Sequence, residues 1–283
     1  MKKRAFGRTG WTVGEIGFGA WQIGGGWGEQ DDAQAVEVLR AACGRGVDFF
    51  DTALGYGEGH SERLIGRALG DVRKKIRIAS KVPPKNRRWP ATDDDPIATT
   101  FPARHIIEST ETTLTNLGTD YLDLQQLHTW APSYIERDEW REAAAKLKQQ
   151  GKILAFGVSA NDWDPYGTVD LVQSGEIDSI QVIYNIFEQR PAERLLPAAL
   201  DTNTAVIVRV PFEEGFLTGK FRPGHSFAEG DWRADWMTEE RLREVERRLE
   251  PLAAIAEGRG DTPAGLALRF CLAHPAVSTV IPG

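Results

Sequence analysis

The sequence predicts a (β/α)8 barrel of the TIM type, preceded by an N-terminal β-hairpin. Three observations favour it: short β-like runs alternate with helical runs, eight such strands follow the hairpin, and 283 residues suit one barrel. We therefore expect residues 1–283 to form a single barrel domain. The alternative, an open doubly wound sheet, should carry a Gly-x-Gly-x-x-Gly turn. Neither glycine-rich segment, 17–28 or 55–59, has that spacing.

The hairpin and the strands are predicted from runs rich in β-branched and aromatic residues bounded by turn residues. The hairpin strands are 4–7 and 12–14, on either side of Arg8-Thr9-Gly10. The barrel strands are expected at 15–19, 47–51, 76–81, 121–128, 153–159, 179–184, 205–210 and 277–281.

The helices are predicted from apolar residues that recur with a period close to 3.6. They are expected at 30–44, 60–69, 103–117, 135–150, 165–173, 192–201, 238–257 and 262–273. Four glycines come directly after helical runs, where a left-handed residue is favoured, namely Gly70, Gly118, Gly151 and Gly175.

Composition excludes several classes of partner. A formal net charge of −7 argues against nucleic acid, and no apolar run is long enough to span a membrane. The basic N-terminus lacks the apolar stretch of a secretory signal. Cys43 and Cys271 give neither a disulfide framework nor the spacing of a metal site. We expect a cytoplasmic protein without a bound metal.

Four polar residues stand at or just after the ends of three successive predicted strands. Asp51 ends the second strand and Tyr56 lies in the loop that follows, Lys81 ends the third strand, and His128 ends the fourth. The carboxyl ends of the strands carry the active residues of such barrels. Alone, each has an ordinary explanation, such as a strand-end cap or a charge at the rim. Together, on adjacent strands, they favour a site.

These residue types suit proton donation to a carbonyl oxygen. A partly desolvated lysine needs a carboxylate partner, which Asp51 provides. We expect the lysine cation to lower the pKa of the Tyr56 phenol, which then delivers a proton to a developing alkoxide. A neutral His128 can orient the carbonyl by a hydrogen bond. The set offers no good nucleophile, so hydride must come from elsewhere.

The segments Asp51-Thr52-Ala53-Leu54-Gly55-Tyr56-Gly57, Ser80-Lys81 and Leu127-His128 resemble the Asp-Tyr-Lys-His tetrad of the aldo-keto reductase family. Further segments also resemble this family, and they follow one another in the family's order as far as Ile281-Pro282-Gly283. The resemblance implies reduction of an aldehyde or ketone by a nicotinamide cofactor, with Tyr56 as general acid. NADP, as NADPH, is the expected cofactor by family habit, and NAD is the alternative.

The resemblance also implies residues that bind the cofactor. Ser159 and Gln181 would meet the nicotinamide amide, and the segment 215–220 would lie along the pyrophosphate. The full set of expected cofactor contacts is Gly19, Trp21, Ser159, Asn161, Gln181, Arg209, Pro211, Phe212, Gly215, Leu217, Gly219 and Lys220.

The sequence departs from the family at three places. Ala160 separates Ser159 from Asn161, where the family often has Ser-Asn. Arg209 stands where an aromatic residue usually stacks on the nicotinamide. We hypothesise that Arg209 stacks there and favours the reduced cofactor, the other reading being an ion pair with a nearby acid. The chain ends at Gly283, before the family's 2′-phosphate loop and last covering helix, so we expect the eighth strand to expose apolar surface.

Seven of the nine tryptophans fall in loops at the predicted catalytic mouth, namely Trp21, Trp27, Trp89, Trp130, Trp163, Trp232 and Trp236. Some of them will anchor long loops. We predict that Trp21, Trp89 and Trp130 line an apolar pocket for the carbonyl substrate.

Two other functions fit parts of the sequence. One is a barrel that binds the cofactor for regulation or redox sensing, without significant turnover. The other is a barrel glycosidase that would use Asp51 with a second acid such as Asp123, but it leaves Lys81 and Tyr56 without a role.

Overall fold

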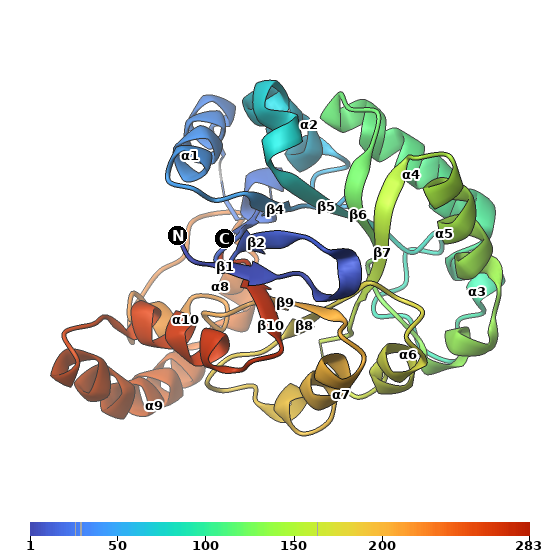
Figure 1. Cartoon of the computed structure of the whole chain (residues 1–283). Helices are drawn as coiled ribbons and strands as arrows, with labels where there is room; N and C mark the ends of the chain where they lie inside the picture. The colour runs from blue at the N-terminus through green and yellow to red at the C-terminus, as the bar shows by residue number, and fades with distance from the viewer. Residues whose placement is uncertain (26, 29, 163) are drawn as a thin grey trace.

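The computed structural model describes residues 1–25, 27–28, 30–162 and 164–283, and it shows parallel strands surrounded by helices (Figure 1). The barrel strands are β3 (Phe18–Gly19), β4 (Phe49–Asp51), β5 (Arg77–Val82), β6 (Leu122–Leu127), β7 (Ile153–Ser159), β8 (Ser179–Ile183), β9 (Ala205–Arg209) and β10 (Val277–Val280). They pair in sequence order, all parallel. The Ile16–Val280 bridge joins the first strand to the last, so the predicted (β/α)8 barrel is confirmed.

Helices connect the strands and form the outer layer (Figure 1). They are α1 (Asp32–Gly44), α2 (His60–Leu69), α3 (Ile97–Thr100), α4 (Ala103–Leu117), α5 (Glu139–Gln149), α6 (Val169–Ser174), α7 (Leu195–Asp201), α8 (Arg233–Trp236), α9 (Glu239–Gly258) and α10 (Pro263–Ala273). Among the described residues, no helix is both long and apolar enough to cross a membrane.

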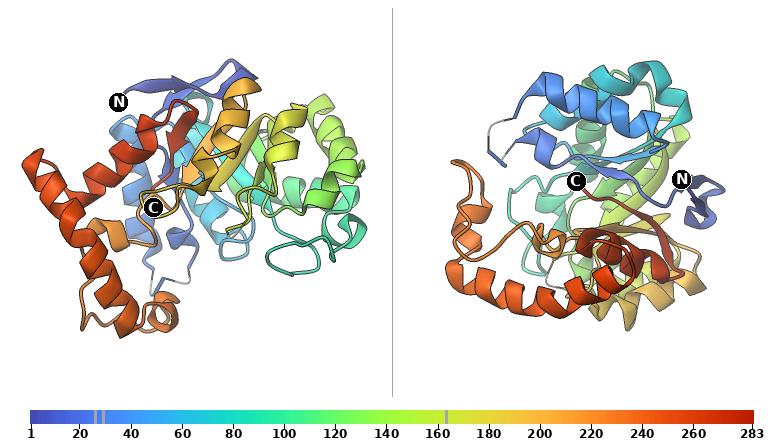
Figure 2. Two further views of the ribbon diagram at one scale, coloured as in Figure 1. Left: turned by 90° about the horizontal axis from the view of Figure 1, so that it is seen from below. Right: turned by 90° about the vertical axis from the view of Figure 1, so that its left-hand side faces the viewer.

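The hairpin closes one end of the barrel. Its strands β1 (Lys3–Ala5) and β2 (Thr12–Gly14) pair antiparallel. Figure 2 shows the hairpin at the end opposite the loop after β5 and the segment before α9. Phe6 and Val13 are fully buried there against a cluster that includes Phe49 and Ile207 from the strands. Burial of this apolar surface stabilises the closed end and leaves the other end for polar residues.

Three of the four predicted left-handed glycines are confirmed. Gly118, Gly151 and Gly175 have φ of 63°, 68° and 72°, so they end helical turns as expected. The prediction for Gly70 was wrong: it has φ −57° and begins a short 3-10 helix over Gly70–Lys75. The chain continues in a tighter turn there instead of reversing.

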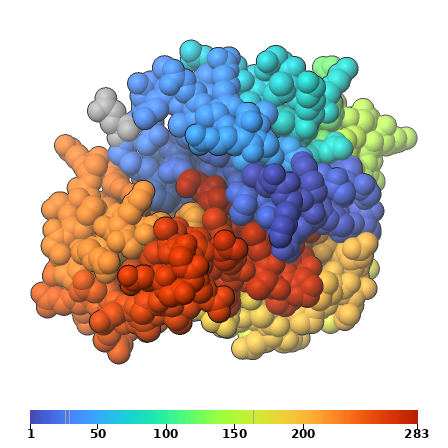
Figure 3. Space-filling model, turned by 60° about the vertical axis from the view of Figure 1, so that its left-hand side comes forward, coloured from blue at the N-terminus to red at the C-terminus, as the bar shows by residue number. Residues whose placement is uncertain are grey.

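The expectation that the last strand exposes apolar surface was wrong. Every residue of β10 is at most 4% exposed. Val277 and Val280 belong to the main core cluster, and α10 packs beside the strand. Figure 3 shows the C-terminal residues lying between the segments of α1 and α10. Helix α10 therefore covers the strand, and Ser278, at the register irregularity with β9, accepts a hydrogen bond from Val206 N at 3.3 Å.

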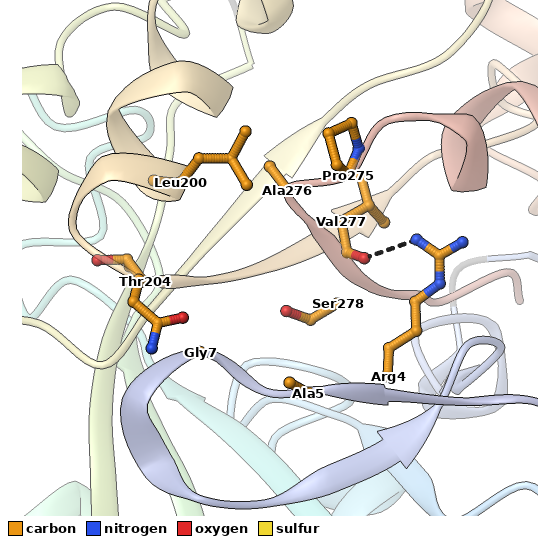
Figure 4. A pocket seen from close by; sticks show the side chains of 11 residues that line it. Arg4, Ala5, Gly7, Leu200, Thr204, Pro275, Ala276, Val277 and Ser278 are labelled. Carbon is orange, nitrogen blue, oxygen red and sulfur yellow. Dashed lines mark hydrogen bonds between the residues drawn. The ribbon is translucent and has the colours of Figure 1, made fainter.

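A hollow of about 320 Å³ lies near the closed end of the barrel, beside the starts of β9 and β10 (Figure 4). Arg4 reaches into its wall but donates to the carbonyl oxygens of Val277 at 3.0 Å and Leu272 at 2.7 Å. The guanidinium ties the hairpin to the end of the barrel. Residues at this end of such barrels serve stability, and the functional site is expected at the opposite end.

Candidate active site

Strand register brings Asp51, Lys81 and His128 to the open end of the barrel. Asp51 pairs with Ala79, and Lys81 lies two residues further along β5. The backbone N–H of His128 donates to Val82 O at 3.0 Å, just beyond the paired residues of β6. The side chains therefore come from neighbouring strand ends, as the sequence predicts.

The turn that carries Tyr56 is shaped by two glycines. Gly57 has φ 60°, and a Cβ there would lie 2.1 Å from Gly24 O. A Cβ on Gly24 would lie 2.8 Å from Tyr56 Cβ. Only residues without side chains allow the two loops this close, so the contact fixes the tyrosine above the strand ends.

Lys81 is the centre of the polar cluster and is fully buried. Its Nζ donates to Asp51 Oδ1 at 2.5 Å, to Thr52 O at 2.8 Å and to Tyr56 Oη at 3.3 Å. Burial lowers the pKa of Lys81, but Asp51 and Tyr56 outweigh it and raise the pKa above its ordinary value. The lysine is therefore a cation held against the phenol oxygen.

The pKa of Tyr56 does not follow the expectation from sequence. Burial raises it above the ordinary value of 10.0, and this outweighs the lowering caused by the Lys81 charge. The charge of Asp51 raises it further. The expected lowering was wrong because sequence shows the lysine partner but not the loss of solvent around the phenol. The phenol is protonated at neutral pH.

His128 completes the cluster with a neutral ring. Burial, then the charges of Lys81 and Arg209, hold its pKa well below the ordinary value of 6.5. Its Nδ1 is buried without a hydrogen-bond partner among the described residues. The ring lies 5.5 Å from the Tyr56 ring and 4.6 Å from the Trp89 ring, between centroids.

The residues expected at the nicotinamide amide divide into two kinds. Ser159 and Gln181 pair with each other across β7 and β8 and are both buried. Asn161 instead connects loops: its Oδ1 accepts from Trp130 N at 3.1 Å, and its Nδ2 donates to Ala91 O at 3.0 Å and Trp130 O at 2.8 Å. Asn161 thus uses its polar atoms to join neighbouring loops in this structure, and its expected role at the nicotinamide amide stays a prediction.

Arg209 is held by neighbours from the loop after β7. Its Nη2 donates to Ala160 O at 3.0 Å and forms an ion pair with Asp162. Of the two interpretations of Arg209, the structure therefore shows the ion pair with a nearby acid. Its Nε is buried without a partner in the described part of the chain.

The remaining cofactor candidates lie at the open end or in the loop after β9. The buried ones are Pro211 and Leu217, the partly buried ones are Gly19, Phe212, Gly215 and Gly219, and the exposed ones are Trp21 and Lys220. Gly215 and Gly219 are left-handed, with φ of 100° and 74°. They bound a single 3-10 turn, Phe216–Thr218.

The tryptophans separate into a rim group and a core residue. Trp21 is 40% exposed with its ring 6.3 Å from that of Tyr56, and Trp89 is 50% exposed beside His128. Trp130 is only 2% exposed and packs edge-on against Tyr134 and Trp140. Trp130 therefore packs as a core residue in this structure, and its expected pocket role stays a prediction that its burial does not favour.

Two tryptophans outside the predicted pocket join the rim group. Trp232 stacks on Trp21 with centroids 5.8 Å apart, and Trp27 meets both edge-on. Trp236 stacks on Phe216. Trp163 lies outside the described residues. The segment before α9 therefore contacts the loop after β3, a pairing that local patterns do not reveal.

Gln126 is a site residue that the sequence reasoning missed. It donates from Nε2 to Asp51 Oδ2 at 3.3 Å and is fully buried. The signal was present: Gln126 is two residues before His128, on the same face of β6.

The fold and the polar cluster define a (β/α)8 barrel with its candidate site at the carboxyl ends of the strands. The Aldo/keto reductase family model matches residues 15–283. The chain is 31% identical over 291 residues to the aldo-keto reductase YhdN of Bacillus subtilis, covering 100% of this chain and 85% of that one. This chain belongs to the aldo/keto reductase family of oxidoreductases.

Two further relatives concern the cofactor. An Escherichia coli protein named NADH-specific methylglyoxal reductase is 30% identical over 295 residues, covering 100% of this chain and 89% of the relative. A crystal structure of an aldo-keto reductase from Klebsiella pneumoniae in complex with NADPH superposes with a TM-score of 0.70 at 27% identity, covering 100% of this chain and 84% of that chain.

Proposed function

We propose that this protein reduces aldehyde or ketone carbonyls to alcohols with NADPH as hydride donor, and that Tyr56 is the general acid. The observation that carries the proposal is the contact of 3.3 Å between Lys81 Nζ and Tyr56 Oη, backed by Asp51. A buried cation beside a phenol stabilises the phenolate that remains after the proton has left.

The charge states of the residues agree with reduction. The raised pKa of Tyr56 keeps its proton available at neutral pH. The lowered pKa of His128 keeps the ring uncharged, so one ring N–H can hydrogen-bond the carbonyl oxygen. Lys81 and Asp51 act on Tyr56, and His128 orients the substrate.

The residues at the nicotinamide end fit the cofactor in part. Ser159 and Gln181 lie side by side at strand ends, and Gln181 donates Nε2 to Asp51, which leaves Oε1 as an acceptor for an amide N–H. The backbone N–H groups of residues 215–220 all donate within the loop, so the exposed side chain of Lys220 is the cationic group that this loop offers to phosphate. When bound, the nicotinamide supplies hydride to the carbonyl carbon.

The choice between NADP and NAD is part of the proposal. One structural relative holds NADPH, and one relative is named for NADH. We infer NADPH, with NADH as the alternative. We also propose that the protein works as one barrel domain in the cytoplasm, where Cys43 and Cys271 would stay reduced. Any effect of Arg209 on the two redox forms stays a prediction.

The experiment is consumption of NADPH and of NADH, measured at 340 nm with a panel of aldehydes and ketones. We expect turnover with at least one carbonyl and a loss of about a thousandfold in Tyr56→Phe. Cofactor binding without turnover by the wild-type protein would instead support the regulatory alternative. Hydrolysis of a glycoside without cofactor would instead support the alternative that the protein is a barrel glycosidase.

A further inference from the structure

The Asp51 carboxylate has more partners than its role as counter-ion to Lys81 requires. Oδ1 accepts from Lys81, and Oδ2 accepts from the amide groups of Gln181 at 2.8 Å and Gln126 at 3.3 Å. Asp51 is only 2% exposed, so these groups replace water around a buried anion. The direction in which Oδ1 faces is therefore set by what holds Oδ2.

The Gln126 side chain has no other hydrogen-bonded partner in the described part of the chain. Its side-chain Oε1 is buried and unpaired, and an unpaired buried acceptor costs about 1–3 kcal/mol. An apolar side chain of the same length would avoid that cost. The benefit of an amide at this position thus lies in its N–H, which faces Asp51.

We propose that Gln126 is a positioning residue for proton transfer, holding Asp51 so that Lys81 stays against the Tyr56 hydroxyl. The proposal rests on the proposed function of Tyr56 as the acid. An N–H donor favours the ionised carboxylate and fixes its orientation. Register supports the arrangement, because Gln126 and Lys81 are direct partners across β5 and β6.

The chain offers a matched control in the adjacent residue. Gln125 is also a glutamine on β6 and is also fully buried, but its partner in register is Ser80 and it lies on the opposite face of the strand. Neither polar atom of its side chain has a hydrogen-bond partner among the described residues. Gln125→Met and Gln126→Met make the same chemical change one residue apart.

The test compares steady-state kinetics of the two variants. In Gln126→Met we expect kcat to fall by about tenfold, the lower end of what loss of an orienting partner costs. KM for the carbonyl should not change, because Gln126 is placed to contact Asp51 and not the substrate. Gln125→Met should match the wild-type protein in both constants.

A second readout needs no turnover, so it separates failure of this proposal from failure of the proposed function. Tyrosine labelled with 13C in the ring gives five signals, and Tyr56→Phe identifies one of them. Without the Gln126 N–H, the charge of Asp51 is less compensated, and that charge raises the pKa of Tyr56. At a fixed alkaline pH we expect less Tyr56 phenolate in Gln126→Met than in Gln125→Met.

Equal kinetics and equal titration in the two methionine variants would overturn the proposal, even if Tyr56→Phe proves inactive. If Gln126→Met does not fold, Gln126→Asn keeps the amide but withdraws it by one methylene. The proposal then requires a fall in kcat and a higher pKa of Tyr56 in Gln126→Asn, and wild-type values for both would contradict it.

Discussion

The two halves of the candidate site are built in different ways. The proton half, on β4 to β6, is a compact cluster in which Lys81 joins Asp51 and Tyr56 through hydrogen bonds of 2.5 and 3.3 Å. The cofactor half, on β7 to β9, depends on loops: Arg209 pairs with Asp162 from the loop after β7. Strand register sets the proton half except for Tyr56, which a contact between two loops places, whereas in the cofactor half only Ser159 and Gln181 are set by register.

Backbone conformation shows the same contrast. The loop after β9 places Val210, Glu213 and Glu214 at φ of 53°, 48° and 52°, a region that side chains rarely adopt. Asn185 donates to Glu213 and to Val210 O, at 2.6 and 3.0 Å, and so holds the loop in this form. Strained residues gather at functional sites when neighbours hold them in place.

The largest effect should come from breaking the proton half at its centre. In Lys81→Met we expect kcat to fall by about a thousandfold. The free energy of unfolding should also fall by about 3–5 kcal/mol, because Asp51 is left as a buried, unpaired charge. Kinetics and urea unfolding measure the two effects.

The double variant Asp51→Asn/Lys81→Met separates them. It removes the uncompensated charge, so stability should recover in part while kcat stays low. Recovery of kcat together with stability would mean that the ion pair only supports the fold.

The next largest effect distinguishes rim from core tryptophans. Trp21→Ala and Trp89→Ala should raise KM for bulky apolar carbonyls by about tenfold, because each removes an exposed apolar face beside Tyr56 or His128. Trp130→Ala should instead lower the free energy of unfolding by about 3–5 kcal/mol, since it leaves a cavity in the core. An unchanged KM in both variants would show that Trp21 and Trp89 do not line the substrate pocket.

A smaller effect is expected in the cofactor half near neutral pH. Burial raises the pKa of Glu214 to about 7. Below that pH the carboxyl is neutral, and above it the carboxylate repels the phosphates of a bound cofactor. If the cofactor phosphates lie along residues 215–220 as proposed, the Kd for NADPH should rise by about fivefold between pH 6 and 8, which corresponds to about 1 kcal/mol of repulsion. The rise should be absent in Glu214→Gln, and a rise that persists there has another cause.

The smallest expected effect is the pH dependence of kcat at saturating cofactor. Tyr56 must be protonated to donate, and its pKa, raised above 10.0, keeps most of it protonated up to about pH 9. His128 must be neutral, and its lowered pKa keeps it so down to at least pH 6.5. We expect kcat to be flat between these limits. A titration midpoint inside the range would show that another group controls the proton step.

The sequence was sufficient for most of the fold because strand alternation is a local pattern. Strand β7 and helices α2 and α4 begin and end where their patterns predict. Strand β2 also matches its prediction, β1 and β5 are shifted against theirs, and the remaining strands are shorter than predicted, since pairing with a neighbour decides where a strand stops. Burial of β10 depends on α10, so it could not be predicted from the strand alone.

The candidate site was predictable where a residue follows directly from strand order. Asp51, Lys81 and His128 meet because adjacent parallel strands end together. The surroundings of Trp130 and Asn161 could not be predicted from local patterns, because Trp130 packs on Trp140 of α5 and the two residues bond to each other across loops. The rise in the pKa of Tyr56 could not be predicted either, because the burial that causes it is a property of the assembled barrel.

The most direct test of the account measures the rate of hydride transfer in a single turnover. The NADPH-loaded protein is mixed rapidly with an aldehyde that it reduces, and the loss of NADPH is recorded. Tyr56→Phe is compared with Tyr134→Phe, which removes the hydroxyl of a tyrosine that is buried elsewhere and bonds Asp95 O at 2.7 Å. The account predicts a rate about a thousandfold lower in Tyr56→Phe and a rate near wild type in Tyr134→Phe. Equal rates in wild type and Tyr56→Phe would contradict the assignment of Tyr56 as the proton donor.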